Sequence, residues 1–360
     1  MRRILAPPSL GSYPVWIGHR LLPRLGHLLA GCLPPGPVAL VSDETVADLY
    51  AGAASTALRS AGFRPFLCLL PGPPGEGVKT LATVAALYDR FLDSGLDRGG
   101  CVVALGGGSV GDLVGFAAAT WLRGLPLVQV PTTLLAMADA SIGGKVGVNL
   151  PRGKNLVGVF KQPALVVADL ETLATLPVRQ VQAACAEIVK TALVGDAALF
   201  AHLEQHGPQP LDEVVARCVE IKLALVARDP EDQGERQLLN LGHTFAHALE
   251  TASEHRLNHG EVVAVGLAIA ANLSCRLGLC PSEVAERVLA LLERLGLPST
   301  FEGVTPEALL SAMACDKKRR AGALRFVLLR DVAAPCLIPA DQVPETTLRA
   351  AFSLDLSPDW

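Results

Sequence analysis

The sequence has few aromatic and few charged residues. Aromatic side chains make up 4% of the 360 residues and charged ones 18%, whereas 50% are hydrophobic. A chain this apolar fills large buried cores, so intrinsic disorder is excluded as its main state. The 31 basic and 35 acidic residues give a net charge of −4. That balance provides no overall positive field to attract nucleic acid or an anionic membrane, so any anion-binding site must be local.

Long apolar runs and paired cysteines are also missing. The apolar stretch 262–271 ends at Asn272, short of the roughly 18–20 residues of a membrane-spanning helix. The apolar segment 4–6 is too short for a signal peptide. The 9 cysteines are odd in number and contain no CxxC pair, which is typical of free thiols in a reducing compartment. We therefore expect a soluble cytoplasmic protein with no membrane partner and no cysteine-ligated metal.

The order of hydrophobic patterns predicts two domains. Over 1–172, short apolar runs alternate with helical periodicity, which is typical of a mostly parallel sheet covered by helices. We predict a Rossmann-like α/β domain there, with strands at 38–42, 63–70, 101–105, 127–130 and 164–168. Over 173–360 a 3.6-residue period dominates and predicts an all-α C-terminal domain. Its expected helices are 178–193, 211–228, 236–252, 260–277 and 282–295, and only 324–329 and 336–338 are expected to form late strands.

A glycine-rich segment follows the predicted strand 101–105. Residues 106–111, GGGSVG, fit the pattern G-x-G-x-x-G and open a helical stretch. Glycines there let the backbone approach a pyrophosphate, whose charge a helix N-terminus favours. The motif follows the third predicted strand rather than the first, and no acidic residue stands about 20 positions later. The segment indicates a nucleotide site, with a tight turn that binds nothing as the alternative.

Asp43 directly follows the first predicted strand. Ligands of open α/β sheets bind beyond the carboxyl ends of the strands, so this carboxylate is placed to hold a ribose. It is equally placed to cap the helix that starts near Glu44. Position alone does not separate the two interpretations.

Three histidines lie within 17 positions in the second half. His243 and His247 are four residues apart on a helical pattern, so they share one helix face, and His259 opens the next predicted helix. Imidazole is a common zinc ligand, and catalytic zinc takes three protein ligands. Glu187, flanked by apolar residues, is the best carboxylate to complete a set. An HxxxH pair alone favours a solvated helix face, but apolar neighbours indicate a buried helix in which histidine needs a partner.

Cationic residues gather where predicted strands and helices end. Lys145 is flanked by glycines, and Lys154 precedes Asn155 without a carboxylate nearby in sequence. We expect both lysines to face an anionic ligand. The basic run 317–320 is as typical of a solvated surface as of a site.

Taken together, these segments resemble the 3-dehydroquinate synthase family. The matching segments follow one another in order over most of the chain, which makes the resemblance specific. They are SDETV at 42–46, GEGVKT at 75–80, GGGSVGDLVGF at 106–116, LRG at 122–124, VPTTLLAMADASIGGKVGVN at 130–149, GKNLVGVFKQP at 153–163, AEIVK at 186–190, LLNLGHTFAHALE at 238–250, NHGE at 258–261 and DKKRRAGALRFVLL at 316–329.

The resemblance implies an NAD-binding domain, a helical metal-binding domain, an active site in the cleft between them, and a homodimer. It implies that zinc, or cobalt in its place, is bound by Glu187, His243 and His259. For NAD it implies Asp43, Glu76, Lys79, Gly108, Ser109, Val110, Gly111, Asp112, Thr132, Thr133, Lys145, Lys154, Thr172 and Thr175. For substrate binding it implies Arg123, Lys154, Lys222, Arg236 and one or both of Lys317 and Lys318. For catalysis it implies Asp139, Lys145, Asn155, Lys190, Asn240 and His247.

The implied reaction converts 3-deoxy-D-arabino-heptulosonate 7-phosphate into 3-dehydroquinate and phosphate, a step of the shikimate pathway to chorismate and the aromatic amino acids. The resemblance implies transient oxidation of the C5 hydroxyl by NAD, phosphate elimination, return of the hydride and aldol closure. His247 is our candidate for the proton relay at C5, because imidazole transfers protons near neutral pH. We expect the phosphate to contact Lys145, Arg123 and Asn155. We expect the carboxylate to contact Arg236 and a lysine of 316–320.

Three alternatives stay open. One is another sugar-phosphate cyclase whose substrate lacks the carboxylate, a reading that the presence of Arg236, Asn240 and His247 disfavours. Another is a metal-dependent dehydrogenase of the glycerol dehydrogenase type, which would release reduced coenzyme rather than phosphate. The third is a nucleotide-binding module without catalysis.

Overall fold

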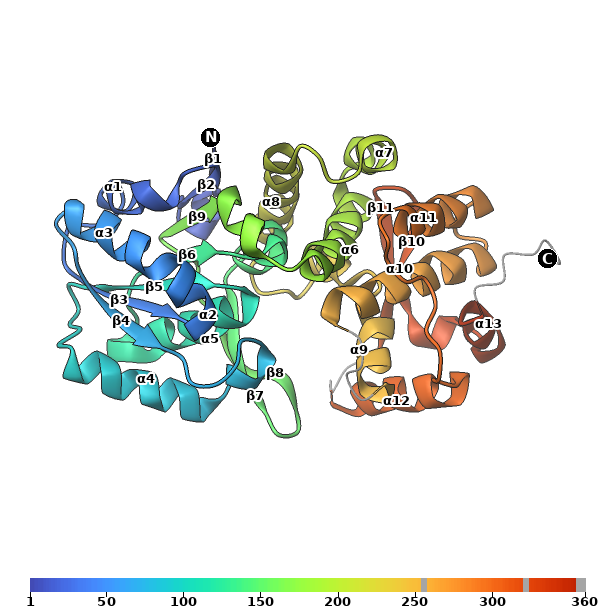
Figure 1. The fold of residues 1–360 in the computed structure, drawn as a ribbon. Coiled ribbons are helices and arrows are strands. Elements are labelled where there is room, and N and C mark those ends of the chain that lie inside the picture. Colours follow the sequence, from blue (N-terminus) through green and yellow to red (C-terminus); the bar gives the residue numbers. More distant parts are fainter. Residues whose placement is uncertain (254–257, 320–323, 354–360) are drawn as a thin grey trace. The chain divides into compact units, whose positions relative to one another are not determined.

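The structure is a computed structural model that describes residues 1–253, 258–319 and 324–353 (Figure 1). The chain divides into two compact units. The first contains Met1–Pro177 and Leu211–Glu231, and the second contains Val178–Pro210 and the chain from Asp232 onward. Among the helices of the described ranges, none combines the length and the apolar character needed to cross a membrane.

The first unit is built on a seven-stranded sheet in the order β1-β2-β9-β6-β5-β3-β4. All neighbouring strands are parallel except β1 and β2, which confirms the predicted mostly parallel α/β domain. The strands are β1 (Arg2–Leu5), β2 (Pro14–Gly18), β3 (Pro37–Ser42), β4 (Arg64–Leu69), β5 (Cys101–Gly106), β6 (Leu127–Pro131) and β9 (Leu165–Asp169). The sequence did not predict β1 and β2. The glycine segment therefore follows the fifth strand, and its placement after the third strand was wrong.

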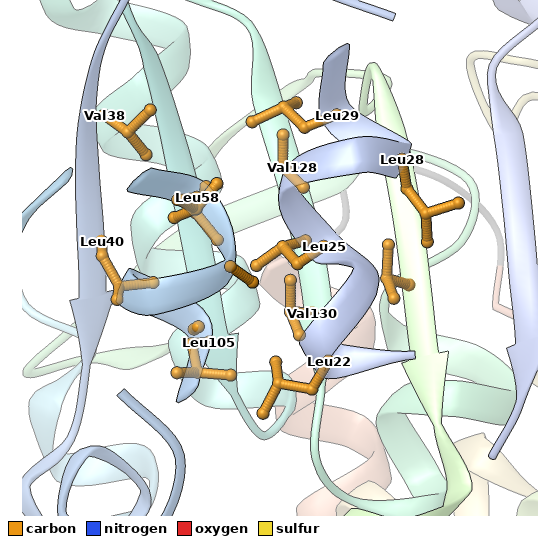
Figure 2. Close-up of a cluster of buried hydrophobic side chains, with 14 of the residues drawn as sticks. Leu22, Leu25, Leu28, Leu29, Val38, Leu40, Leu58, Leu105, Val128 and Val130 are labelled. Atoms are coloured by element: carbon orange, nitrogen blue, oxygen red, sulfur yellow. The ribbon is translucent and has the colours of Figure 1, made fainter. Parts of the chain in front are cut away.

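Helices cover both faces of this sheet. Figure 1 shows α1 (Leu25–Ala30) and α3 (Gly52–Ser60) on one face, with α4 (Leu81–Asp93) and α5 (Gly108–Thr120) on the other. Side chains alternate along a strand, so β3 points Val38 and Leu40 to the first face and Ala39 and Val41 to the second. Figure 2 shows the first of these cores, in which leucines of α1 and α3 pack on β3, β5 and β6. Each large side chain buried there contributes about 1.5–3 kcal/mol.

A separate hairpin of β7 (Lys145–Leu150) and β8 (Gly153–Phe160) packs on α5 through β7. A Cβ atom on Gly115 of α5 would lie 2.3 Å from Val146 Cγ1, so this contact requires glycine. The remaining elements of the unit are η1 (Pro8–Leu10), η2 (Leu22–Arg24), α2 (Glu44–Val46), η3 (Ala47–Ala51), η4 (Glu76–Val78), η5 (Trp121–Arg123), η6 (Ala136–Ala140), η7 (Leu170–Thr175) and α8 (Leu211–Arg228). Helix α8 contacts β1, β2 and η6, which explains why a late segment belongs to this unit.

The second unit is helical apart from one hairpin, so the predicted helical C-terminal domain and its two late strands are confirmed. Its helices are α6 (Val178–Gly195), α7 (Ala197–His206), α9 (His243–Ala252), α10 (His259–Arg276), α11 (Ser282–Arg294), α12 (Pro306–Arg319) and α13 (Glu345–Ala351), with η8 (Glu235–Asn240) and η9 (Ala340–Gln342). The hairpin joins β10 (Arg325–Asp331) to β11 (Ala334–Pro339). Helix α10 is central, because α6, α9, α11, α13 and β10 all contact it.

The predicted continuous helix 236–252 was wrong. The chain instead forms η8 and α9, separated at Gly242, which has φ +76°. A Cβ atom there would lie 2.8 Å from the backbone nitrogen of Leu267. Only glycine permits both the left-handed backbone and this close approach of α9 to α10.

Candidate active site

Three adjacent parallel strands end beside one another in the first unit. Strand β3 leads to Asp43, β5 leads to the glycine segment and β6 leads to Thr132 and Thr133. The Thr132 N–H donates to the Gly106 carbonyl at 3.0 Å, and Ser42 Oγ donates to the Leu105 carbonyl at 2.8 Å. The order of the strands reverses between β3 and β5, which is where open α/β sheets bind ligands.

The glycine segment has the strand, turn and helix context that its pattern predicts. Gly107 precedes α5, whose first residue is Gly108. A Cβ atom on Gly107 would lie 3.1 Å from Thr133, and one on Gly111 would lie 2.8 Å from Gln129. Packing within the unit thus already favours glycine at both positions. The open N-terminus of α5 carries Ser109 and Val110 in its first turn and Asp112 just after.

Asp43 does cap a helix. Its Oδ1 atom accepts a hydrogen bond from the Val46 N–H at 2.9 Å, and the residue is buried. The capping interpretation is therefore part of the structure. Ribose binding by the same carboxylate stays a prediction.

A buried lysine contacts three other residues that the resemblance implied. Lys79 Nζ lies 2.8 Å from Asp112 Oδ2, 2.7 Å from Asn155 Oδ1 and 3.5 Å from Glu76 Oε2. Burial raises the pKa of Asp112 although Lys79 opposes it. Burial acts in the same direction on Glu76, but Lys79, Asn149 and Ser109 outweigh it and lower its pKa. The sequence separates these residues by up to 79 positions. The η4 segment contacts α5, and β8 adds Asn155.

Two other groups of implied residues lie in this unit. Lys222 of α8 pairs with Asp139 of η6, its Nζ being 2.8 Å from Oδ1 and 2.7 Å from the carbonyl oxygen. Thr172 and Thr175 lie on η7, where Tyr50 Oη is 2.6 Å from Thr175 Oγ1 and donates to the Thr172 carbonyl at 3.2 Å. Tyr50 was missed by the sequence analysis, because nothing in its local pattern connects it with residues 122 positions away.

The two lysines expected to face an anion lie at opposite ends of the hairpin. Lys145 begins β7 and pairs in register with Phe160, whereas Lys154 lies at the start of β8 beside the turn. Arg123 lies on η5, where Leu122 and Arg123 both adopt left-handed φ values, +50° and +69°. Two consecutive non-glycine residues in that region carry backbone strain.

In the second unit, three helices bring a carboxylate and two imidazoles together. Glu187 of α6 lies 3.4 Å from His243 Nε2 of α9 and 3.2 Å from His259 Nε2 of α10, both distances measured from its Oε1 atom. The three ligand atoms lie within 4.8 Å of one another. Atoms bound tetrahedrally at about 2.1 Å to one zinc ion lie about 3.4 Å apart, so the observed spacing suits a divalent ion.

The outer partners fix the orientation of both imidazoles. His243 Nδ1 lies 3.2 Å from the Leu241 carbonyl, and His259 Nδ1 lies 3.3 Å from Glu250 Oε1. Each ring therefore donates from Nδ1 and turns Nε2 toward Glu187, the arrangement that metal-binding histidines use. Burial lowers the pKa of His259, but Glu187 and Glu250 outweigh it and raise that pKa to about 9. The surroundings thus favour positive charge at this position.

Glycines allow the three helices to approach closely. A Cβ atom on Gly260 would lie 2.0 Å from the Ala183 carbonyl oxygen of α6, and one on Gly266 would lie 2.2 Å from the Gly242 carbonyl oxygen. Glu187 itself is buried, and its Oε2 atom lies 2.5 Å from Lys190 Nζ. Burial opposes ionisation of Glu187, but Lys190 and His243 hold its pKa well below the ordinary value.

The other implied residues of this unit lie on its elements as follows. His247 is one turn after His243 on α9, with ring centroids 5.7 Å apart. It is not part of the cluster found among the described residues, so Glu187 rather than a third histidine joins His243 and His259. Arg236 is buried on η8, and Asn240 ends that element. Lys317 and Lys318 lie on α12, and residues 320–323 lie outside the described residues.

Solved structures share this fold. One is 2-epi-5-epi-valiolone synthase from Streptomyces hygroscopicus subsp. jinggangensis 5008, with NAD+ and Zn2+ bound in that protein. It is 33% identical, with a TM-score of 0.86, and the match covers 95% of this chain and 96% of that one. The fold and the His-His-Glu cluster place the chain in the class of proteins that pair a Rossmann-like α/β unit with a helical unit suited to a divalent ion.

Within that class, the chain belongs to the 3-dehydroquinate synthase family. The family model for the 3-dehydroquinate synthase N-terminal region matches residues 70–183, and that for the C-terminal region matches residues 184–319. A 3-dehydroquinate synthase of Nostoc punctiforme is 44% identical over 94% of this chain and 95% of its own length. One of Symbiobacterium thermophilum is 48% identical over 88% of this chain and 90% of its own.

Proposed function

We propose that the chain is an NAD- and divalent-metal-dependent carbon–oxygen lyase that converts 3-deoxy-D-arabino-heptulosonate 7-phosphate into 3-dehydroquinate and phosphate. Family membership supports this reaction, which belongs to the shikimate pathway. The observation that carries the proposal is the cluster of Glu187, His243 and His259, whose spacing and outer partners suit a catalytic ion.

The chain's own residues divide the binding between the units. Glu187, His243 and His259 hold zinc or cobalt, and the residues beyond β3, β5 and β6 hold NAD. When bound, NAD supplies a reversible hydride acceptor and the ion supplies a Lewis acid. The α5 N-terminus orients the pyrophosphate through its backbone N–H groups. We propose 1–172 for NAD binding and 173–360 for metal and substrate binding, although helix α8 of the later part folds with the first unit.

Proton transfer and charge recognition fall to polar residues around these sites. His247 accepts the proton of the C5 hydroxyl and returns it, since imidazole works in both directions near neutral pH. The phosphate is held by Lys145, Arg123 and Asn155, and Lys154 is a further substrate contact. The carboxylate is held by Arg236 together with Lys317, Lys318 or both, because a guanidinium binds a carboxylate through two parallel hydrogen bonds. Asp139 with Lys222, Lys190 and Asn240 complete the substrate contacts.

A phosphate-release assay tests the reaction. Zinc-loaded chain with NAD should release phosphate from the heptulosonate, form 3-dehydroquinate and leave no lasting NADH absorbance. His247→Asn should slow release by about 10²–10⁴-fold while zinc content stays unchanged. His206→Asn, on the exposed end of α7, is the matched control. Accumulating NADH, release only from sugar phosphates without a carboxylate, or full activity in His247→Asn would contradict the proposal.

We further propose that the chain forms a homodimer. Strand β8 exposes Leu156, Val159 and Phe160, and Leu122 beside Arg123 is exposed as well. Exposed apolar side chains along an open strand edge favour association with another chain. If Arg123 serves the neighbouring copy's site, mixing Arg123→Ala with His247→Asn restores activity at about one quarter of the sites, because half of the dimers are hybrids with one intact site. A monomer by light scattering would contradict the homodimer. No recovery in the mixture would contradict the role of Arg123 in the neighbouring copy's site.

The proposed location is the cytoplasm. Eight of the nine cysteines, those whose side chains the structure describes, are free thiols, which suits a reducing compartment. Fractionation of cells that produce the native chain tests this, and recovery in an exported fraction would refute it.

A further inference from the structure

Asn149, near the end of β7, joins three segments of the first unit. Its Nδ2 atom donates to Glu76 Oε2 at 3.0 Å, and its Oδ1 atom accepts from the Asn155 N–H at 2.8 Å. Its own backbone N–H donates to the Lys79 carbonyl at 2.7 Å. One amide side chain thus connects the η4 segment with the start of β8.

Glu76 and Asn155 are each held by further contacts besides the Asn149 amide. Asn155 has a left-handed backbone with φ +53°, and its side chain accepts from Lys79 Nζ at 2.7 Å. Glu76 is bound from two sides, by Ser109 Oγ at 2.8 Å and by the Asn149 amide. Asparagine adopts the left-handed region more readily than other non-glycine residues, and the acceptor on Asn149 holds Asn155 in it.

The side chain of Asn149 does this through polar contacts alone. It is partly exposed, whereas the preceding Val148 is fully buried and supplies the packing of β7. Removing the amide therefore changes the positions of Glu76 and Asn155 more than it changes the core.

We propose that Asn149 is a positioning residue that fixes Glu76 for dinucleotide binding and Asn155 for phosphate binding. The inference rests on the proposed function, because that function gives Glu76 and Asn155 their roles. An aspartate at this position keeps the acceptor for the Asn155 N–H but places an oxygen opposite the Glu76 carboxylate. Like charges at hydrogen-bond distance repel, so Asn149→Asp displaces Glu76 alone.

The inference is tested by exchanging the amide donor and the carboxylate between positions 149 and 76. The measured quantity is NAD affinity, which does not depend on turnover. The dissociation constant of NAD is measured by calorimetry on the zinc-loaded full chain for the wild type, Asn149→Asp, Glu76→Gln and the double variant. Both single variants should weaken NAD binding by about tenfold, the effect of losing one charge-assisted hydrogen bond. The double variant puts an amide donor on position 76 opposite a carboxylate on position 149, so it should bind NAD at least about fivefold more tightly than the additive expectation.

Asn149→Ala supplies the second arm. It should weaken NAD binding and raise the KM for the heptulosonate while the melting temperature stays within a few degrees of the wild type. Additive effects in the double variant, or wild-type affinities in all variants, would overturn the inference even if the wild type releases phosphate. The wild type could bind NAD, and the double variant could show the expected recovery of affinity, without any release of phosphate. That outcome would overturn the proposed reaction alone. A wild type that binds no NAD would overturn both.

Discussion

The imidazole of His259 lies between two carboxylates, with Nδ1 3.3 Å from Glu250 Oε1 and Nε2 3.2 Å from Glu187 Oε1. Glu250 is the single acidic residue of α9, and it is buried. The ring therefore has one nitrogen committed to an outer partner and the other turned toward the cluster. The outer carboxylate fixes which nitrogen is available to an ion.

Removal of this outer partner should weaken metal binding. Glu250→Ala frees the His259 ring and should lower zinc affinity by about 10–100-fold, as measured by competition with a chelator. Glu250→Gln keeps an oxygen acceptor for His259 Nδ1, so its zinc affinity should fall much less. Equal affinities in the wild type and in Glu250→Ala would show that the ring needs no such support.

Gly260→Ala should separate the helices that carry the cluster. The new Cβ atom would lie 2.0 Å from the Ala183 carbonyl oxygen, one turn before Glu187 on α6. We expect a loss of about 1–3 kcal/mol in the free energy of unfolding together with weaker zinc binding. Gly52→Ala on α3, where nothing lies within 4 Å of the new atom, should be neutral or slightly stabilising. Denaturant titration of both variants checks this, and unchanged stability in Gly260→Ala would contradict the close approach.

Tyr50→Phe should loosen the η7 segment. The variant loses the hydroxyl that contacts Thr175 Oγ1 at 2.6 Å and the Thr172 carbonyl at 3.2 Å. One hydrogen bond is worth about 1 kcal/mol, so NAD affinity should fall about fivefold if η7 contacts NAD. Tyr88→Phe removes a similar bond to Thr120 on the other face of the sheet and serves as the control. Calorimetry that gives the same NAD affinity for both variants would remove η7 from the nucleotide site.

Cys275 should be the most reactive of the eight cysteines whose side chains the structure describes. Its Sγ atom lies 3.4 Å from that of Cys280, and this hydrogen bond outweighs burial and lowers the pKa of Cys275 to about 7. The thiolate fraction, and hence the rate of alkylation, rises as the pH rises through that value. Peptide mass spectrometry after timed iodoacetamide treatment measures it.

The control for this prediction is Cys280→Ala, which removes the donor. Burial then dominates at Cys275, so its alkylation should shift to higher pH. Cys101 should stay unlabelled, because burial raises its pKa to about 12. An alkylation profile of Cys275 that is identical with and without Cys280 would refute the pairing.

The parallel sheet was predictable because its central strands are continuous apolar runs, as strands buried on both faces are. The hairpin of β7 and β8 was not. Its glycines and lysines are typical of a ligand-binding segment. The pairing of Gly147 with Gly158 across the two strands is visible only in the structure. A Cβ atom on Gly147 would lie 2.7 Å from the Val157 carbonyl oxygen, so these glycines serve the pairing itself. Glycine content alone does not distinguish that role from ligand binding.

The cluster residues were predictable as residue types from local patterns, whereas their combination was implied only by the family resemblance. Helical spacing put His243 and His247 on one face, and it gave no reason to prefer one of them beside His259. The choice depends on how α9 meets α10, which is set by Gly242 and Gly266 through backbone contacts between distant segments. For the same reason the sequence could not reveal Asn149 or Tyr50, whose partners are brought to them by tertiary folding.

The return of helix α8 to the first unit affects how the chain is made. A ribosome that has delivered residues 1–177 has not yet delivered Lys222, the partner of Asp139 on η6. Residues 178–210, which emerge in between, belong to the second unit and must wait for α9 and α10 before Glu187 meets its histidines. Domains usually mature one after another during translation. Here the second unit starts before the first is complete, so their maturation is interleaved.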